Sequence, residues 1–201
     1  MKIVIPGGSG QVGTILSRVF HKEGHEVIVL SRKPTAQPWS VVQWDGETVG
    51  PWVEVVNGAD VIINLAGRSV DCRYNAANRK TIMASRVNST RTIGEAIRKA
   101  KYPPHTWLQA STATIYAHRY DQSNDELTGI IGSTPKFAMP DTWQFSIDVA
   151  MAWEQAVDDV QLPRTRTVKL RSAMVMSPDK GGVFDTLRTL VRYGLGGRSV
   201  R

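Results

Sequence analysis

A glycine-rich turn close to the N-terminus constrains this chain more than any other feature. Residues 7–13 read Gly-Gly-Ser-Gly-Gln-Val-Gly and directly follow the apolar run of residues 2–5. Behind the turn, apolar side chains recur at helical spacing as far as Phe20. Glycines let the backbone approach a ligand closely, and the first amides of a helix attract phosphate. The segment therefore predicts a strand, a phosphate-binding turn and a helix in succession. We expect ligand contacts from Gly7, Gly10, Gln11, Val12 and Gly13.

The rest of the chain alternates short apolar runs with longer segments of helical period, which is typical of a parallel sheet covered by helices. We expect strands at residues 2–5, 26–30, 41–44, 61–65, 106–110 and 167–170. Further helices are expected at about residues 76–100, 143–160 and 183–193. The predicted fold is α/β, a Rossmann-type doubly wound parallel sheet with helices on both faces, in a single domain over residues 1–201. The irregular stretch 111–140 is of the kind that brings ligands to the sheet.

Composition narrows the classes of function. Cys72 is the only cysteine, so an internal disulfide and a cysteine-rich zinc site are excluded, and the histidines lie too far apart in sequence to indicate another metal site. No apolar stretch has the length of a membrane helix or of a signal-peptide core, so we expect a cytoplasmic protein. The net charge of +7 allows an anionic partner, but the basic residues are dispersed and lack interleaved aromatics. We expect a small-molecule ligand, and neither a nucleic acid nor a membrane as partner.

The residues after the second predicted strand indicate which dinucleotide would bind. NAD-binding proteins usually carry an acidic residue there, which binds the ribose 2′-hydroxyl. This chain has Ser31, Arg32 and Lys33 instead. No carboxylate at this strand end repels a 2′-phosphate, and the planar guanidinium of Arg32 suits a phosphate group. We therefore expect NADP as cofactor, with Ser31 and Arg32 near its 2′-phosphate. The alternative is that these are solvated loop residues.

Several short segments together carry a family resemblance. They are residues 7–13, 64–67, 85–86 with 90, 111–116, 153–154, 170–171 and 194–197. In these segments the chain resembles the extended short-chain dehydrogenase/reductases, and within them the atypical group called epimerase family proteins, which is related to nucleotide-sugar epimerases. Because the segments are spread over almost the whole chain, they are more specific as a set than any one of them alone.

The resemblance implies further site residues. Asn64, Ala66 and Gly67 would line the adenosine side and the middle of the cofactor groove, and Ser111 would lie beside the nicotinamide. Thr112 matches the hydroxyl residue that holds a substrate oxygen in active epimerases. Arg171 and residues 172–176 would lie near the nicotinamide and the substrate. For Asn64 and Ser111, the alternative is a structural role in capping strand ends.

The catalytic Tyr-x-x-x-Lys pattern of active members is absent. Aligned on residues 153–154, its two positions hold Ser146 and Ala150, which supply neither a proton donor of suitable pKa nor a charge. The atypical group also departs from the pattern here. The side chains that could replace the tyrosine are Tyr116, His118 and Asp148, none of which has a partner at diagnostic spacing. We take Thr112 and Tyr116 as the candidate catalytic residues, although Tyr116 could instead pack or contact the substrate.

Two hypotheses on function follow. The first is an NADP(H)-binding, epimerase-like oxidoreductase that acts on a nucleotide sugar or a similar small molecule. The second is a module that binds NADP(H) as a sensor or regulator without turnover, as Ser146 and Ala150 suggest. The resemblance also implies a further segment beyond residues 194–197 that builds a C-terminal substrate lobe, which we expect to be largely missing here. An exposed sheet edge would then allow self-association into a homodimer.

Overall fold

The computed structural model describes residues 1–119, 121–133 and 140–197, and it contains a six-stranded parallel sheet. The strands are β1 (Lys2–Pro6), β2 (Glu26–Ser31), β3 (Ser40–Gln43), β4 (Val61–Asn64), β5 (Thr106–Thr112) and β6 (Arg166–Ser172). They lie in the order β3-β2-β1-β4-β5-β6. The strand order reverses between β1 and β4, which is where doubly wound folds bind dinucleotides. The predicted Rossmann-type sheet is therefore confirmed.

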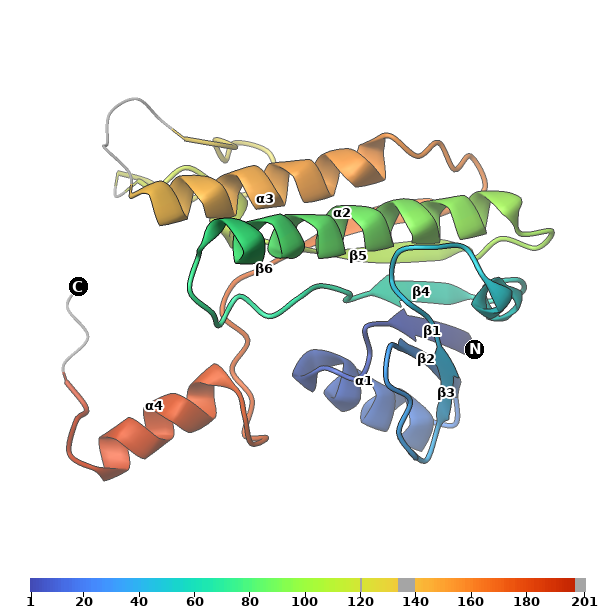
Figure 1. Ribbon diagram of the computed structural model, residues 1–201, viewed down its shortest axis with the longest axis horizontal. Helices are drawn as coiled ribbons and strands as arrows, with labels where there is room; N and C mark the ends of the chain where they lie inside the picture. Colours follow the sequence, from blue (N-terminus) through green and yellow to red (C-terminus); the bar gives the residue numbers. More distant parts are fainter. Residues whose placement is uncertain (120, 134–139, 198–201) are drawn as a thin grey trace.

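Helices cover both faces of the sheet (Figure 1). α1 (Gln11–Lys22) covers one face, and α2 (Ala76–Lys99) and α3 (Asp141–Asp158) cover the other. The chain also forms α4 (Val183–Arg192) and the short 3-10 turns η1 (Pro51–Val55) and η2 (Ala113–Ile115). Alternation along β1 sets the two faces, because successive side chains of a strand point to opposite sides. Val4 packs with Ile93 and Ile97 of α2, whereas Ile3 and Ile5 pack in a separate cluster with Leu16 and Phe20 of α1.

The ends of the helices follow from their local sequence. The side chain of Asn75 caps α2 by accepting a hydrogen bond from the amide of Asn78 at 2.9 Å. After α1, Gly24 adopts a φ of +80°, a conformation that favours glycine and reverses the chain into β2. Among the described helices, none combines the length and the apolar character that a membrane-spanning helix requires.

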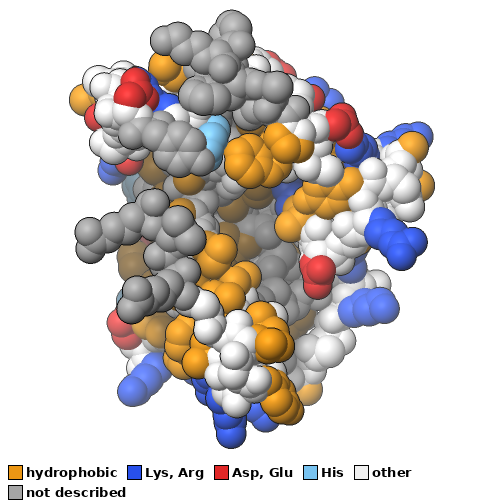
Figure 2. Space-filling view, turned by 90° about the vertical axis from the view of Figure 1, so that its left-hand side faces the viewer, with side chains coloured by type: hydrophobic (Ala, Val, Ile, Leu, Met, Phe, Trp, Pro, Cys, Tyr) orange, Lys and Arg blue, Asp and Glu red, His pale blue; other side chains and the backbone are white. Residues whose placement is uncertain are grey.

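The last helix, α4, differs from the others in having no buried residue. It lies apart from the sheet and from α2 and α3 (Figure 1), and Gly182 at its N-terminal end packs against the side chain of Gln11 of α1. Its apolar side chains, among them Phe184, Leu187 and Val191, are exposed. Figure 2 looks onto the side toward which the strands end and shows apolar side chains around a hollow. The described residues thus hold the Rossmann sheet, without a C-terminal lobe packed on α4.

Candidate functional site

The glycine-rich turn lies where β1 ends, beside the end of β4. Gly7 has a φ of +75°, and a Cβ atom on it would lie 2.7 Å from the Cα atom of Ala66. A Cβ atom on Gly13 would lie 2.3 Å from the Cα atom of Gly8. The backbone could not keep this path with side chains at either position. The turn therefore packs against the residues after β4, and the first turn of α1 packs against the turn itself, at the reversal of strand order.

A pocket of about 280 Å³ opens at this turn. Among its lining residues are Gly7, Gly10, Ser31, Arg32, Ala66 and Gly67, all of which the sequence predicted to contact the cofactor. Three other predicted residues, Gln11, Val12 and Gly13, lie just behind it in the first turn of α1. The structure thus brings together residues from three strand ends, and their contact with a cofactor stays a prediction.

Arg32 extends from the end of β2 into this pocket and is exposed. In the part of the chain that the structure describes, no carboxylate forms an ion pair with it. Ser31 beside it is 4% exposed, and its hydroxyl lies in hydrogen-bonding contact with that of Ser9 at 3.2 Å. A free guanidinium at the rim of a glycine-lined pocket fits an anionic group there.

The sequence analysis missed two acidic residues in the same pocket, Asp45 and Glu47. Asp45 follows β3, which pairs with β2, so its carboxylate reaches the pocket from the neighbouring strand end. A hydrogen bond from the hydroxyl of Thr48, with others from the amides of Thr48 and Glu47, lowers the pKa of Asp45. The carboxylate is thus ionised at neutral pH and already engaged by its own turn. The sequence did contain a signal for Asp45, because this residue comes just after β3, whose end meets the same edge of the sheet.

The polar residues at the ends of β4 and β5 are engaged inside the protein. Asn64 is fully buried, and its amide donates to Oε1 of Gln109 at 2.9 Å and accepts from the amide of Ala66 at 3.1 Å. Ser111 donates to Oε1 of Glu154 at 2.6 Å. The hydroxyl of Thr112 accepts from the amide of Thr114 at 3.2 Å and caps η2. Asn64 therefore holds Ala66 in place for the pocket without lining it.

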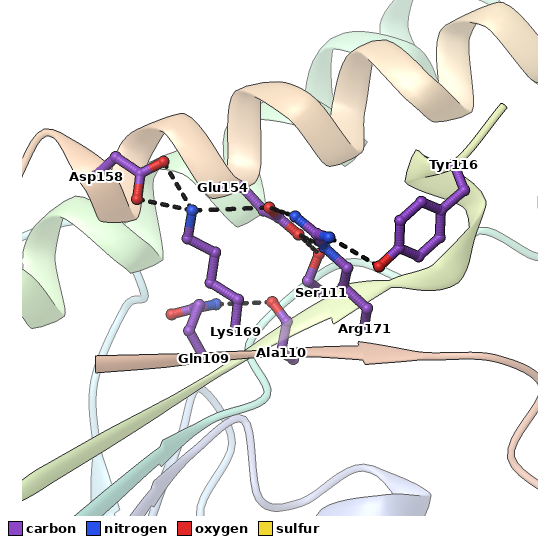
Figure 3. A network of polar contacts seen from close by, with 8 residues as sticks. All are labelled: Gln109, Ala110, Ser111, Tyr116, Glu154, Asp158, Lys169 and Arg171. Atoms are coloured by element: carbon purple, nitrogen blue, oxygen red, sulfur yellow. Dashed lines mark hydrogen bonds and ion pairs between the residues drawn. The ribbon is translucent and has the colours of Figure 1, made fainter. Parts of the chain in front are cut away.

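A network of charged residues joins α3 to β6 (Figure 3). Nε and Nη2 of Arg171 each donate to an oxygen of Glu154 at 2.8 Å, and Nη1 donates to the hydroxyl of Tyr116 at 2.8 Å. Lys169 forms an ion pair with Glu154 and with Asp158. Burial raises the pKa of Glu154, but hydrogen bonds from Arg171 and Ser111 outweigh it and hold that pKa below its usual value. The hydrogen bond to Glu154 raises the pKa of Arg171.

This network was not predicted, although both of its central residues stand in the segments that carry the family resemblance. Glu154 and Arg171 lie on different elements, and no spacing in the sequence pairs them. Arg171 and Tyr116 also line a larger cavity, of about 790 Å³, beside η2 and α3. Tyr116 is thus the predicted catalytic residue that reaches both the network and a cavity.

The two positions of the absent Tyr-x-x-x-Lys pattern lie on the inner side of α3. Ser146 lines the larger cavity, and its hydroxyl donates to the carbonyl of Thr142 at 2.9 Å. Ala150 is fully buried. The other two replacement candidates are His118, which lines the same cavity, and Asp148, which is exposed and accepts a hydrogen bond from Gln144. Position 150 therefore supplies no charge to the cavity.

Comparisons with known proteins find relatives that match almost the whole chain. The epimerase family protein SDR39U1 of Bos taurus is 31% identical over 202 residues, which cover 98% of this chain and 62% of that protein. The crystal structure of human SDR39U1 with NADPH superposes with a TM-score of 0.77 at 27% identity, covering 98% of this chain and 61% of that one. A nucleoside-diphosphate sugar epimerase of Corynebacterium glutamicum superposes with a TM-score of 0.73, also at 27% identity, covering 98% of this chain and 38% of that one.

The chain thus spans about three fifths of the length of its SDR39U1 relatives. The resemblance that the short segments carried is confirmed, because a family model matches residues 3–161, which include the glycine-rich turn, nearly all of β1, and all of β2 to β5 and α1 to α3. The chain belongs to the NAD dependent epimerase/dehydratase family.

Proposed function

We propose that the chain binds NADP(H) in the pocket at the glycine-rich turn and forms the cofactor-binding part of an epimerase-like oxidoreductase. Its substrate would be a nucleotide sugar or a similar small molecule. The observation that carries this proposal is Arg32, an exposed cation without a carboxylate partner among the described residues, at the rim of a pocket floored by glycines. A relative of similar fold, human SDR39U1, was crystallised with NADPH.

The residues present fit such a cofactor. The close approach of Gly7 to Ala66 leaves a path where backbone, and not side chains, faces the ligand. The amides at the start of α1 point toward this path, and the helix dipole favours a pyrophosphate there. The carboxylates of Asp45 and Glu47 line the same pocket and oppose a 2′-phosphate, so Arg32 must outweigh them. A bound nicotinamide would supply the hydride donor or acceptor.

Tyr116 is the side chain that we propose as proton donor to a substrate oxygen. Because its hydroxyl oxygen accepts a hydrogen bond from Arg171, its own O–H must point elsewhere. Tyr116 lines the larger cavity, and a substrate oxygen bound there is the acceptor that we propose for this proton. Glu154 holds the guanidinium of Arg171 by two hydrogen bonds and thereby fixes the position of Tyr116. Thr112, whose hydroxyl bonds with Thr114 at the wall of the same cavity, would contact the substrate.

We predict that Arg32→Ala lowers the affinity for NADPH about tenfold and leaves the affinity for NADH unchanged. The change removes hydrogen bonds to a charged group, which contribute about 1.5–3 kcal/mol when well formed, and exposure reduces this. Titrations followed by ligand fluorescence measure both affinities. Arg98→Ala, an exposed arginine at the far end of α2, serves as control. Equal effects on NADPH and NADH would show that Arg32 does not contact the 2′-phosphate.

A second candidate function is a sensor that binds NADP(H) without turnover. It is favoured by Ser146, whose hydroxyl is bonded to its own helix, and by Ala150, which supplies no charge. The two functions separate in one assay. An enzyme transfers hydride to or from NADP(H) with at least one member of a panel of nucleotide sugars and small carbonyl compounds, whereas a sensor binds NADPH and transfers hydride to none.

A further inference from the structure

A third cavity, of about 220 Å³, lies between α2 and α3. Its walls are mainly apolar and include Ile82, Phe145 and Trp153, and Thr112 and Ser146 contribute hydroxyl groups. Arg86, on α2, is the one charged residue that the structure describes in this lining. An apolar cavity that holds a single cation is suited to a ligand with an apolar body and one negative charge.

The guanidinium of Arg86 is held in place by neutral groups alone. Its Nη1 donates to the carbonyls of Arg68 and Ile82, both at 3.1 Å. Its Cζ lies 5.1 Å from the centre of the Trp153 ring, and it packs against Gly67, where a Cβ atom would lie 3.3 Å from Cζ. Within the described ranges, Nε and Nη2 donate to no acceptor, so one edge of the planar fork stays open.

Arg86 differs in this respect from two arginines close to it in the fold. Arg79 pairs with Asp141, and Arg171 pairs with Glu154. No Asp or Glu of the described residues forms an ion pair with Arg86. Burial lowers the pKa of Arg86, as expected for a cation withdrawn from water, yet a guanidinium stays protonated at neutral pH. A buried charge without a counter-charge is costly, and proteins usually pair it.

We propose that this cavity is a substrate subsite for a carboxylate, with Arg86 as its counter-ion and the walls from α2 and α3 around the apolar part of the same molecule. A carboxylate matches the open Nε–Nη2 edge of Arg86 with two parallel hydrogen bonds. The inference rests on the proposed function, because Thr112 and Ser146 place the cavity on the substrate side of the site. It adds the substrate class, a molecule that carries a carboxylate.

A phosphate of the cofactor is the other anion that could reach Arg86. The structure favours the substrate, because the cavity shares no lining residue with the pocket at the glycine-rich turn. Gly67 belongs to that pocket and packs against the guanidinium, so Arg86 lies between the two spaces and lines only the third cavity. The cavity does share Thr114 and Ser146 with the larger cavity that Tyr116 lines. A carboxylate at Arg86 therefore leaves the rest of its molecule near Tyr116.

The test uses the indole N–H of Trp153, which donates to Thr90 at 3.0 Å and gives an NMR signal assigned by loss in Trp153→Phe. Benzoate and 3-phenylpropionate are titrated into the unmodified protein, with benzamide and 3-phenylpropionamide as neutral matches. We expect saturable shifts of the Trp153 signal with the carboxylates and none with the amides. Equal responses to acid and amide, or no response to either, would overturn the proposal.

Variants of Arg86 test whether this residue binds the carboxylate. Arg86→Met should weaken carboxylate binding at least tenfold, and Arg86→Lys, which keeps the charge but loses the planar fork, should weaken it less. Arg91→Met, an exposed arginine on the same helix, should bind carboxylate as the unmodified protein does. If Arg86→Met does not fold, the carboxylate affinity of Arg86→Lys alone tests the proposal. Unchanged carboxylate binding in Arg86→Lys and Arg86→Met would contradict the proposal.

NADPH titrations of the same proteins separate the two sources of the anion. Under the proposal, Arg86→Lys leaves the affinity for NADPH within about twofold of the unmodified protein, and saturating NADPH does not displace benzoate. A tenfold loss of NADPH affinity with benzoate displaced would assign Arg86 to the cofactor and overturn the proposal. If the unmodified protein binds benzoate but not NADPH, the proposed function fails while the carboxylate subsite stands.

Discussion

Gly13→Ala is expected to destabilise the protein by about 3 kcal/mol and to remove any stabilisation by NADPH. The new methyl group would lie 2.3 Å from the Cα atom and 2.6 Å from the carbonyl oxygen of Gly8. Both are backbone atoms, so relief requires α1 to move away from the turn. For a chain of this length, the loss corresponds to a fall in melting temperature of about 6–12 °C. Thermal unfolding with and without NADPH measures both effects.

Gly10→Ala is the matched control in the same turn. Gly10 has a φ of −76°, and the nearest atom to its added Cβ is the carbonyl oxygen of Gly7 at 3.6 Å. The melting temperature of the free protein should therefore change little. Similar melting of the Gly13→Ala variant and the unmodified protein would mean that the close packing of the turn does not determine its shape.

Glu154→Gln is expected to destabilise the protein by about 3 kcal/mol, because it leaves the charge of Arg171 without its main partner. The side chain of Glu154 is 7% exposed and that of Arg171 is 18% exposed, so solvent compensates little. Because glutamine keeps the shape of the side chain, the change in stability measures the contribution of the negative charge of Glu154. Equilibrium unfolding in urea measures it. Glu95→Gln, which breaks the exposed pair of Glu95 with Lys99 on α2, is the control and should change stability little.

The effect of Glu154→Gln should depend on pH. The folded protein holds the pKa of Glu154 below its usual value of 4.5, so the ionised carboxylate contributes stability above that value. This contribution is lost as the pH falls through the lowered pKa of the folded state. The difference in stability between the two proteins should thus be constant near neutral pH and shrink below about pH 4. A difference that persists unchanged at acid pH would show that the charge of Glu154 is not its source.

The sheet could be predicted from the sequence because its physics is local. Each predicted strand is an apolar run of the right length, and the six runs match β1 to β6 to within a few residues. The glycine-rich turn after β1 could also be predicted from the sequence, because its glycines lie close together in the chain. The pocket residue Ser31 followed from its place at the end of the second predicted strand, whereas Ala66 and Gly67 were implied by the family resemblance.

The polar network and the third cavity could not be predicted, because they depend on contacts between distant segments. Glu154 meets Arg171 only when α3 packs beside β6, and the packing of α2 on α3 places Arg86 against Trp153. Nothing in the sequence distinguishes Arg86, which lacks a carboxylate partner among the described residues, from Arg79, which pairs with Asp141. Asp45 is a different case, because it directly follows the predicted third strand, and its place in the pocket depends on the pairing of β3 with β2.

The three cavities follow the carboxyl edge of the sheet in order. The pocket at the turn lies at the ends of β1, β2 and β4, the cavity of Arg86 reaches the end of β5, and the cavity of Tyr116 reaches β6. Under the proposed function, the cofactor occupies the first of these spaces and the substrate extends through the other two.

The most direct test of cofactor binding at the glycine-rich turn is an NMR map of NADPH on the unmodified protein. Backbone amide signals are recorded while NADPH is added, and the residues whose signals shift show where the ligand binds. We predict the largest shifts at the amides of residues 7–13, with further shifts at residues 31–33 and 65–67, and little change at Gly58, on the opposite edge of the sheet. Absence of shifts at the glycine-rich turn, or shifts confined to another surface, would contradict this assignment of the cofactor site.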